Sequence, residues 1–240
     1  GVMNTDNMTI SGETIDYGPC AFMDTYNPET VFSSIDHQGR YAYFNQPGIT
    51  KWNLSRFAET LIPLLHEKEK ISIEIATEAI NSFEKIYKES WLTMMRSKLG
   101  LFTSDKDDET LVNDLLNLMD NKKMDYTNTF CFLMKENFMN KQIFEDKDFI
   151  AWIKKWENRL LKNNKPFDLS LNLMKKNNPL VIPRNFKVEE SLNDANNFNL
   201  DSTNKLIEAL KNPYDNSLQR IEYQNIPPSD SKNYKTFCGT

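Results

Sequence analysis

The sequence predicts a mainly α-helical protein with a small section of short strands and loops at its amino-terminal end. Five of the seven glycines lie within the first 48 residues, so turns are concentrated there. From Trp52 onward, apolar residues recur with helical spacing in successive segments as far as residue 211. The 240 residues include 39% hydrophobic and 26% charged residues, which is typical of a globular protein with a sizeable core.

The first of three expected parts, residues 1–50, contains two candidate strands, NMTI and TIDY, on either side of Ser11-Gly12-Glu13. These three residues favour a tight connection. Pro28 and Pro47 limit any helix in the turn-rich remainder. The run Asp36-His37-Gln38-Gly39-Arg40 can be an acid–histidine pair, but we expect a structural turn that supports an active site.

The second part, residues 51–211, is expected to be helical. Its first helix begins near Trp52, with Asn53 or Ser55 as its cap and Pro63 as a kink or an end. The other helices are expected at residues 71–99, 107–120, 126–138, 146–162, 167–176, 187–197 and 201–211.

Single residues mark two helix boundaries and the end of the helical part. Gly100 is a typical stop for the helix before it, and Asp201 or Ser202 is expected to cap the last helix. The third part, residues 212–240, is rich in Pro and Asn and shows little periodicity. It predicts an extended tail that contains Cys238.

The charge of the chain is uneven. The net charge is −5, and residues 1–50 carry all of it, because six carboxylates face only Arg40 there. An acidic, loop-rich end suits a cation or a cation-bound nucleotide. No basic stripe is visible, which argues against nucleic acid as a partner.

The cysteines and apolar runs limit the class of protein further. Cys20, Cys131 and Cys238 lie far apart without a CxxC pair, and only His37 and His66 accompany them. A structural zinc site is therefore not expected, and the cysteine count fits a reducing compartment. No apolar run reaches the length of a membrane span, so no membrane is expected as a partner.

Three oxygen-bearing side chains in the opening stretch suggest metal chemistry. Asn7 and Asp16 provide an amide and a carboxylate oxygen, which are ligands that Mg²⁺ accepts beside phosphates and water. Asp6, next to Asn7, is an additional acid that can stay unligated and act as a base. From spacing alone, turn chemistry explains the same residues, because Asp and Asn are favoured in loops.

The spacing also resembles a protein-kinase site. Kinases place an Asn five residues after the catalytic-loop Asp, and later an Asp-Phe-Gly motif. If Asn7 matches the kinase Asn, Asp16-Tyr17-Gly18 takes the place of Asp-Phe-Gly, and Val2 occupies the position of the catalytic base. The metal ligands are thus kept, the usual base is absent, and Asp6 stands in a shifted position.

Longer motifs identify the family that the chain resembles. GVMNTDNM, TIDYGP, SSIDHQGRYAYFNQP and WNLSRFAETLIPL are similar to the selenoprotein O family, also called SelO or YdiU. NPLVIPRNFKVEESLNDA, LKNPYDN and IPPSDSKNYKTFCGT resemble the carboxy-terminal half of that family. The resemblance covers most of the chain and is weakest at residues 100–165.

The resemblance implies a fold and an activity. The fold is the carboxy-terminal lobe of a protein-kinase-like fold with a pseudokinase site, here without the amino-terminal lobe. The activity is ATP-dependent transfer of AMP, with UMP as a second possibility, to Ser, Thr or Tyr hydroxyls of protein substrates. Asp6 matches the proton acceptor, Asn7 and Asp16 match the ligands of Mg²⁺ or Mn²⁺, and Asp16 also neighbours the nucleotide phosphates.

The resemblance carries further expectations. The family's catalytic loop begins with a His one place before Gly1, and its amino-terminal lobe has no counterpart here, so the chain alone should be inactive. Cys238 falls where the family places selenocysteine or cysteine, which suggests a redox role with Cys20 as our candidate partner; an ordinary free thiol is the alternative. The family implies the cytoplasm in a bacterium and the mitochondrion in a eukaryote.

Two other functions remain open from the residues. One is a catalytically silent, pseudokinase-like helical module that binds partners, and the other is a conventional kinase. Asp6 beside Asn7 argues against a silent module, and Val2 argues against a kinase. The aromatic residues Tyr41, Tyr43, Phe44 and Trp52 are expected in the core rather than in a base-stacking surface.

Overall fold

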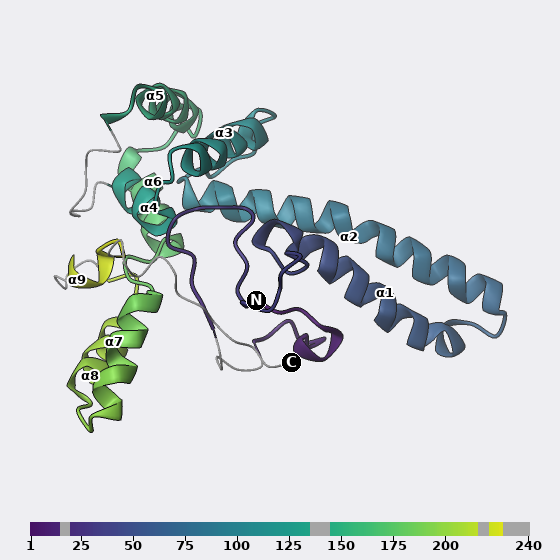
Figure 1. Cartoon of the computed structure of the whole chain (residues 1–240). Coiled ribbons are helices and arrows are strands. Elements are labelled where there is room, and N and C mark those ends of the chain that lie inside the picture. The colour runs from purple at the N-terminus through teal and green to yellow at the C-terminus, as the bar shows by residue number, and fades with distance from the viewer. Residues whose placement is uncertain (15–19, 135–144, 216–220, 228–240) are drawn as a thin grey trace. The chain divides into compact units, whose positions relative to one another are not determined.

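The computed structural model is mainly helical, as the sequence predicts (Figure 1). The residues that it describes are 1–14, 20–134, 145–215 and 221–227. The chain divides into two compact units. Of the described residues, the first unit comprises 1–14, 20–21 and 28–91, and the second comprises 22–27, 92–134, 145–215 and 221–227.

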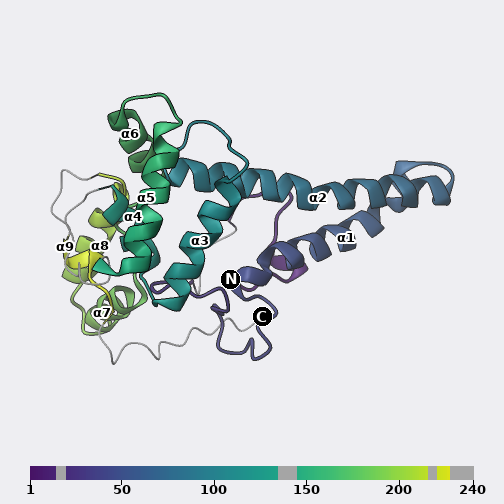
Figure 2. The ribbon, with the colours of Figure 1, turned by 90° about the horizontal axis from the view of Figure 1, so that it is seen from above.

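The first unit is a turn-rich segment followed by a pair of helices. Its elements are η1 (Thr5–Asn7), η2 (Tyr43–Asn45), α1 (Gln46–Leu65) and most of α2 (Glu69–Lys98). α1 and α2 run antiparallel, side by side (Figures 1 and 2). Lys51 Nζ lies 2.6 Å from Glu84 Oε1, and this ion pair joins the two helices.

The predicted start of the first helix is wrong by six residues. α1 begins at Gln46, with Pro47 in its first turn. Proline is tolerated there because the first N–H groups of a helix have no intrahelical partner. Asn53 is therefore not a cap but a buried residue inside the helix, and α1 continues past Pro63 to Leu65.

The predicted strand at residues 7–10 does not form. Thr5–Asn7 is a 3-10 turn, and Gly12, with φ of 71°, closes another turn by donating to Thr9 O at 3.2 Å. Local bonds therefore satisfy this backbone, and most of the second candidate strand lies outside the described residues. Among the described residues, the only β-pairing is an isolated antiparallel bridge between Thr25 and Asp125.

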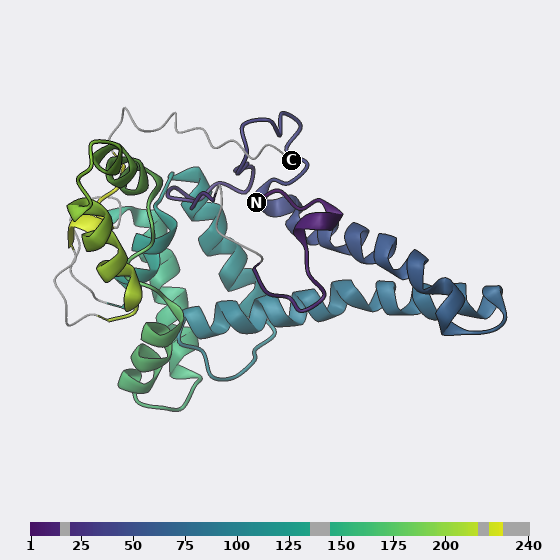
Figure 3. The ribbon, with the colours of Figure 1, turned by 90° about the horizontal axis from the view of Figure 1, so that it is seen from below.

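The second unit contains the other helices. They are α3 (Asp108–Asn121), α4 (Tyr126–Leu133), α5 (Lys147–Leu161), α6 (Phe167–Asn177), α7 (Asn185–Asn196), α8 (Asp201–Lys211) and α9 (Ile221–Gln224). α3 lies beside α5 (Figure 2), and α7 and α8 form an antiparallel pair (Figure 3). The first six begin within two residues of their predicted starts. Among the described residues, no helix combines the length and apolar character that a membrane crossing requires.

Two tryptophans on α5 organise the core of the second unit. Trp152 and Trp156 stack with their ring centres 6.2 Å apart, and Phe149 stacks on Trp152 at 6.0 Å. Both indoles are buried, yet each N–H has an acceptor 2.9 Å away, Leu111 O for Trp152 and Leu99 O for Trp156. The core therefore buries large aromatic area without leaving these donors unsatisfied.

Helix ends account for the remaining differences from prediction. Gly100 has φ of 73° and follows α2, as predicted. The residue before α8 is Leu200, without a side-chain cap, because Asn199 Oδ1 accepts from Asp201 N at 3.0 Å. α9 was not predicted, since Ile221–Gln224 is too short to show periodicity.

Candidate functional site

The predicted catalytic loop is a short turn at the start of the first unit. Asp6 and Asn7 lie next to each other in η1, and Asn7 N donates to Asn4 O at 3.0 Å. Asp6 is exposed and Asn7 is half-buried. Asp16 lies outside the described residues, so the expected convergence of all three side chains stays a prediction.

Two residues from later in the chain hold this loop. Tyr41 Oη donates a hydrogen bond to Asn4 Oδ1. Asn53 Nδ2, inside α1, donates to Met3 O at 2.9 Å and to the sulfur of Met8. Contacts from positions 41 and 53 thus bracket Asp6 and Asn7 on both sides, and neither contact was predicted.

The run from Asp36 to Arg40 is a structural turn, as expected. Both carboxylate oxygens of Asp36 accept backbone N–H groups at 2.8 Å, one from Arg40 and one from Tyr41. Gly39 has φ of 64°, and its carbonyl accepts from Asn45 Nδ2 at 2.7 Å. The turn therefore fixes the backbone of Tyr41, which in turn contacts the loop.

The donor set fits a divalent metal only in part. Among the described residues, no three His, Cys, Asp or Glu side chains gather to hold an ion. Asn7 is adjacent to Asp6, and no described residue bonds to either side chain. Magnesium in nucleotide sites takes one or two protein oxygens and fills its octahedron with phosphates and water. One amide and the Asp16 carboxylate would satisfy that requirement.

The expected aromatic core of residues 41–52 is wrong in part. Trp52 is 43% exposed and Phe44 is 55% exposed. Arginine guanidinium groups lie over the Trp52 ring instead, with Arg40 Cζ 5.0 Å and Arg56 Cζ 5.3 Å from its centre. The exposed surface next to the loop is therefore cationic and aromatic.

A buried arginine organises the second unit. The Arg184 side chain is 1% exposed, and it donates to Asp125 at 2.7 and 3.1 Å and also to Asp24. Burial raises the pKa of Asp24, although the Arg184 charge and hydrogen bond oppose the rise. Arg184 Nε also donates to Tyr223 O in α9 at 3.3 Å. These bonds are structural, since they join segments of one unit.

A second buried ion cluster surrounds Asp108, at the start of α3. Its carboxylate is fully buried and accepts from Arg96 Nε and Arg159 Nε, each at 2.6 Å. Although burial opposes the effect, the hydrogen bonds from Arg159 and Arg96 hold the pKa of Asp108 below its usual value. The sequence presents Asp108 only as an acid in a first helical turn, because its partners lie 12 and 51 residues away.

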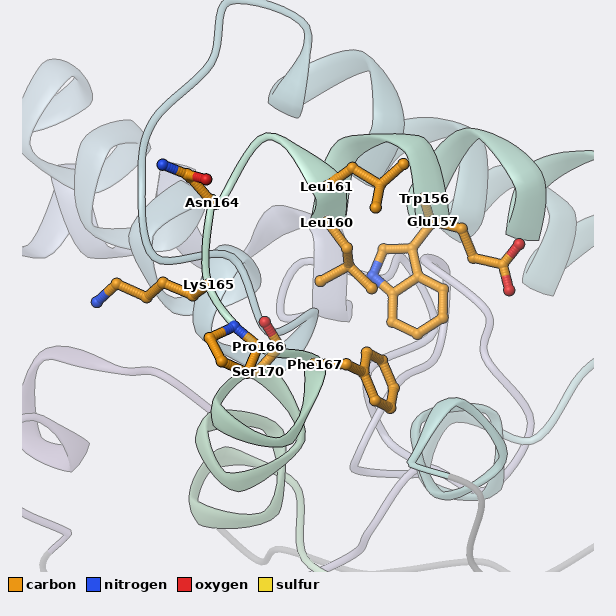
Figure 4. A pocket seen from close by; sticks show the side chains of 9 residues that line it. All are labelled: Trp156, Glu157, Leu160, Leu161, Asn164, Lys165, Pro166, Phe167 and Ser170. Atoms are coloured by element: carbon orange, nitrogen blue, oxygen red, sulfur yellow. The ribbon is translucent and has the colours of Figure 1, made fainter.

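The second unit also has a surface pocket, between the end of α5 and the start of α6 (Figure 4). Its volume is about 610 Å³, and Trp156, Leu160 and Phe167 contribute its apolar lining. Glu157 and Lys165 are its charged residues. None of the predicted site residues lines it, so it offers no link to the expected chemistry.

The described cysteines are not in disulfides. Cys20 is exposed, and Cys131 is buried with its thiol 3.8 Å from Pro179 O. Cys238 lies outside the described residues. The expected redox role of Cys238 and its pairing with Cys20 therefore stay predictions.

Comparison with known proteins identifies the class of protein. Residues 1–211 match the family model described as protein adenylyltransferase SelO. Over its whole length the chain is 56% identical to the protein nucleotidyltransferase YdiU of Pelagibacter ubique, and it covers 50% of that protein. It is 50% identical to the YdiU protein of Clostridium beijerinckii and 51% identical to that of Brevibacillus brevis, covering 49% of each.

The chain therefore belongs to the SelO family of protein adenylyltransferases, as its motifs indicated. It spans about half the length of the curated relatives that it matches.

Proposed function

We propose that this chain forms the catalytic part of an ATP-dependent protein nucleotidyltransferase. The reaction joins AMP to a Ser, Thr or Tyr hydroxyl of a protein substrate and releases pyrophosphate, and UMP transfer from UTP follows the same scheme. The observation that carries the proposal is the free acid beside Asn7. Asp6 is exposed, and no described residue bonds to its carboxylate, so it is available as a base.

The proposed roles divide the chemistry among three side chains. Asp6 accepts the proton of the incoming hydroxyl as the oxygen attacks the α-phosphorus. Asn7 and Asp16 hold Mg²⁺ or Mn²⁺, and Asp16 also faces the nucleotide phosphates. The metal, when bound, neutralises charge on the triphosphate and on the leaving pyrophosphate.

The family supports a wider proposal for the fold. We propose that the chain is the carboxy-terminal lobe of a protein-kinase-like fold and that an amino-terminal lobe completes the nucleotide site. The curated relatives are about twice as long as this chain, which leaves room for such a lobe. The chain alone should then bind ATP weakly and transfer little AMP, while the longer protein should be active. We also propose a bacterial cytoplasmic or mitochondrial location and a redox role for Cys238.

Labelled ATP tests the activity in the full-length protein. We expect label from the α-phosphate on protein and none from the γ-phosphate. Transfer of γ-label would instead identify a kinase, and no transfer would favour a silent interaction module.

Substitutions then test the roles. Asp6→Asn removes the base and should lower AMP transfer by at least about 100-fold, the usual effect of losing general-base catalysis. Glu13→Gln is the matched control, because Glu13 is an exposed acid of the same stretch, and it should retain activity. Asp16→Ala should abolish transfer and weaken Mn²⁺ binding, and an active Asp16→Ala protein would refute the metal assignment.

A further inference from the structure

We propose that Tyr41 and Asn53 are positioning residues, which hold the loop of Asp6 and Asn7 in its reactive geometry. The inference rests on the proposed function, because it assigns these two residues to the same reaction. Neither touches the expected base or metal, and each acts through a loop residue.

The first support is the placement of the hydrogen bonds. Tyr41 Oη donates to Asn4 Oδ1, and Asn4 O accepts the N–H of Asn7. The phenol therefore fixes the residue on which the turn of Asp6 and Asn7 closes.

The second support is the buried amide of Asn53. Asn53 is 6% exposed, and its Nδ2 contacts Met3 O before Asp6 and the Met8 sulfur after Asn7. Its Oδ1 accepts no hydrogen bond from the described residues. Burying an unpaired amide oxygen is unfavourable, and a leucine of similar size would avoid it. The amide therefore stabilises the fold through the hydrogen bonds that its Nδ2 donates to the two ends of the loop.

The third support is the rigidity of the two elements that carry Asn53 and Tyr41. Asn53 belongs to α1, seven residues after its start, and the Asp36 carboxylate fixes the Tyr41 backbone with two bonds of 2.8 Å. Side chains on rigid elements can set an active loop within the tolerance that catalysis needs. η1 alone is a single 3-10 turn, so its geometry depends on such outside contacts.

Hydroxyl and amide deletions with matched controls test the proposal. Tyr41→Phe removes one hydroxyl. Tyr87→Phe removes the hydroxyl of an exposed tyrosine of α2, and no described residue bonds to that hydroxyl. Asn53→Leu removes the buried amide. Asn178→Leu is its control, because Asn178 is buried in the second unit with the same pattern, two donated bonds and an unpaired Oδ1.

The first measurement needs no activity. Amide hydrogen exchange of Asn7 on this chain should become about tenfold faster in Tyr41→Phe and Asn53→Leu, and unchanged in both controls, because the turn opens more often. Unchanged exchange at Asn7 in both variants would overturn the proposal.

The second measurement is AMP transfer by the full-length protein. We expect kcat to fall about 10- to 100-fold in Tyr41→Phe and Asn53→Leu, with KM for ATP within twofold of wild type. A merely structural role predicts instead that Asn178→Leu lowers kcat as much as Asn53→Leu, and this result would overturn the proposal. An inactive wild-type protein would refute the proposed function, and the exchange rates would still decide whether these bonds hold the loop.

Discussion

Lys98 provides a quantitative test of the packing in the second unit. It is the last residue of α2 and is 9% exposed, with its ammonium 4.5 Å from the centre of the Phe130 ring and 5.6 Å from that of Tyr126. Its hydrogen-bond acceptor is Asn177 O at 3.2 Å. Burial lowers the pKa of Lys98 from 10.5 to about 8, an effect that the neighbouring Cys131 opposes.

The shift of the Lys98 pKa determines how stability changes with pH. Below pH 8 the amine is charged in the folded and unfolded states, and the folded state bears the full cost of burying the charge. Between about pH 8 and 10.5 the unfolded state binds the proton and the folded state does not, so stability rises with pH. Lowering this pKa from 10.5 to about 8 corresponds to about 3.4 kcal/mol of stability over the whole window, and to about 2 kcal/mol by pH 9.5.

The perturbation is Lys98→Met, which keeps an apolar chain of similar length and removes the titrating amine. At pH 7 it should raise the free energy of unfolding by about 0–2 kcal/mol. Removing the buried charge stabilises the variant, and the loss of the donor to Asn177 O offsets part of this gain. The decisive quantity is the difference between wild type and Lys98→Met, measured by urea unfolding at pH 7 and 9.5. From pH 7 to pH 9.5, the free energy of unfolding of wild type should rise by about 2 kcal/mol relative to that of the variant.

A control separates this effect from a general change in charge. Lys85 lies on the same helix with its side chain 81% exposed, and Lys85→Met removes the same charge from an exposed site. The difference in the free energy of unfolding between wild type and Lys85→Met should not change between pH 7 and 9.5. If the corresponding difference for Lys98→Met is also constant, within about 0.5 kcal/mol, the reasoning on the buried amine is refuted.

Four further substitutions test the fold by urea unfolding. Gly100→Ala should cost about 2–3 kcal/mol, because φ is 73° and the new Cβ would lie 2.9 Å from a backbone oxygen; Gly12→Ala, at φ of 71° with open space, should cost only about 1 kcal/mol. Asp108→Asn should cost about 3–5 kcal/mol by leaving the buried Arg159 and the half-buried Arg96 without their charge partner. This loss should shrink as pH falls through the lowered pKa of Asp108, where wild type also loses the charge. Arg184→Met should cost a similar amount, and equal stability in wild type and either variant would contradict the assigned pairing.

Helices α3 to α8 of the second unit were predictable because each carries a local signal. The start of α5, for example, is marked by Asp146, whose carboxylate accepts from the N–H groups of Asp148 and Phe149. The apolar period after it places Trp152 and Trp156 on one buried face. Cap and period are both local properties, so a sequence shows them without knowledge of the fold.

The start of α1 was missed for an equally local reason. Pro47 was interpreted as a residue that limits a helix, whereas it occupies the first turn of one. That error assigned Asn53 to a helix cap and so concealed its burial. The ion clusters of Asp108 and Arg184 were missed for a different reason, because their partners are distant in sequence and only the folded chain brings them together.

The candidate site combines both kinds of information. Asp6 and Asn7 are adjacent, so their sequence is enough to suggest a base beside a metal ligand. Two oxygen-bearing side chains on one short turn have no fixed geometry, however, and catalysis depends on that geometry. Tyr41 and Asn53 contact the loop from 34 and 46 residues beyond Asn7, at Asn4, Met3 and Met8, and we propose that these contacts set its geometry. The proposed chemistry of the loop therefore follows from its own residues, while its rigidity depends on contacts from the turn at Asp36 and from α1.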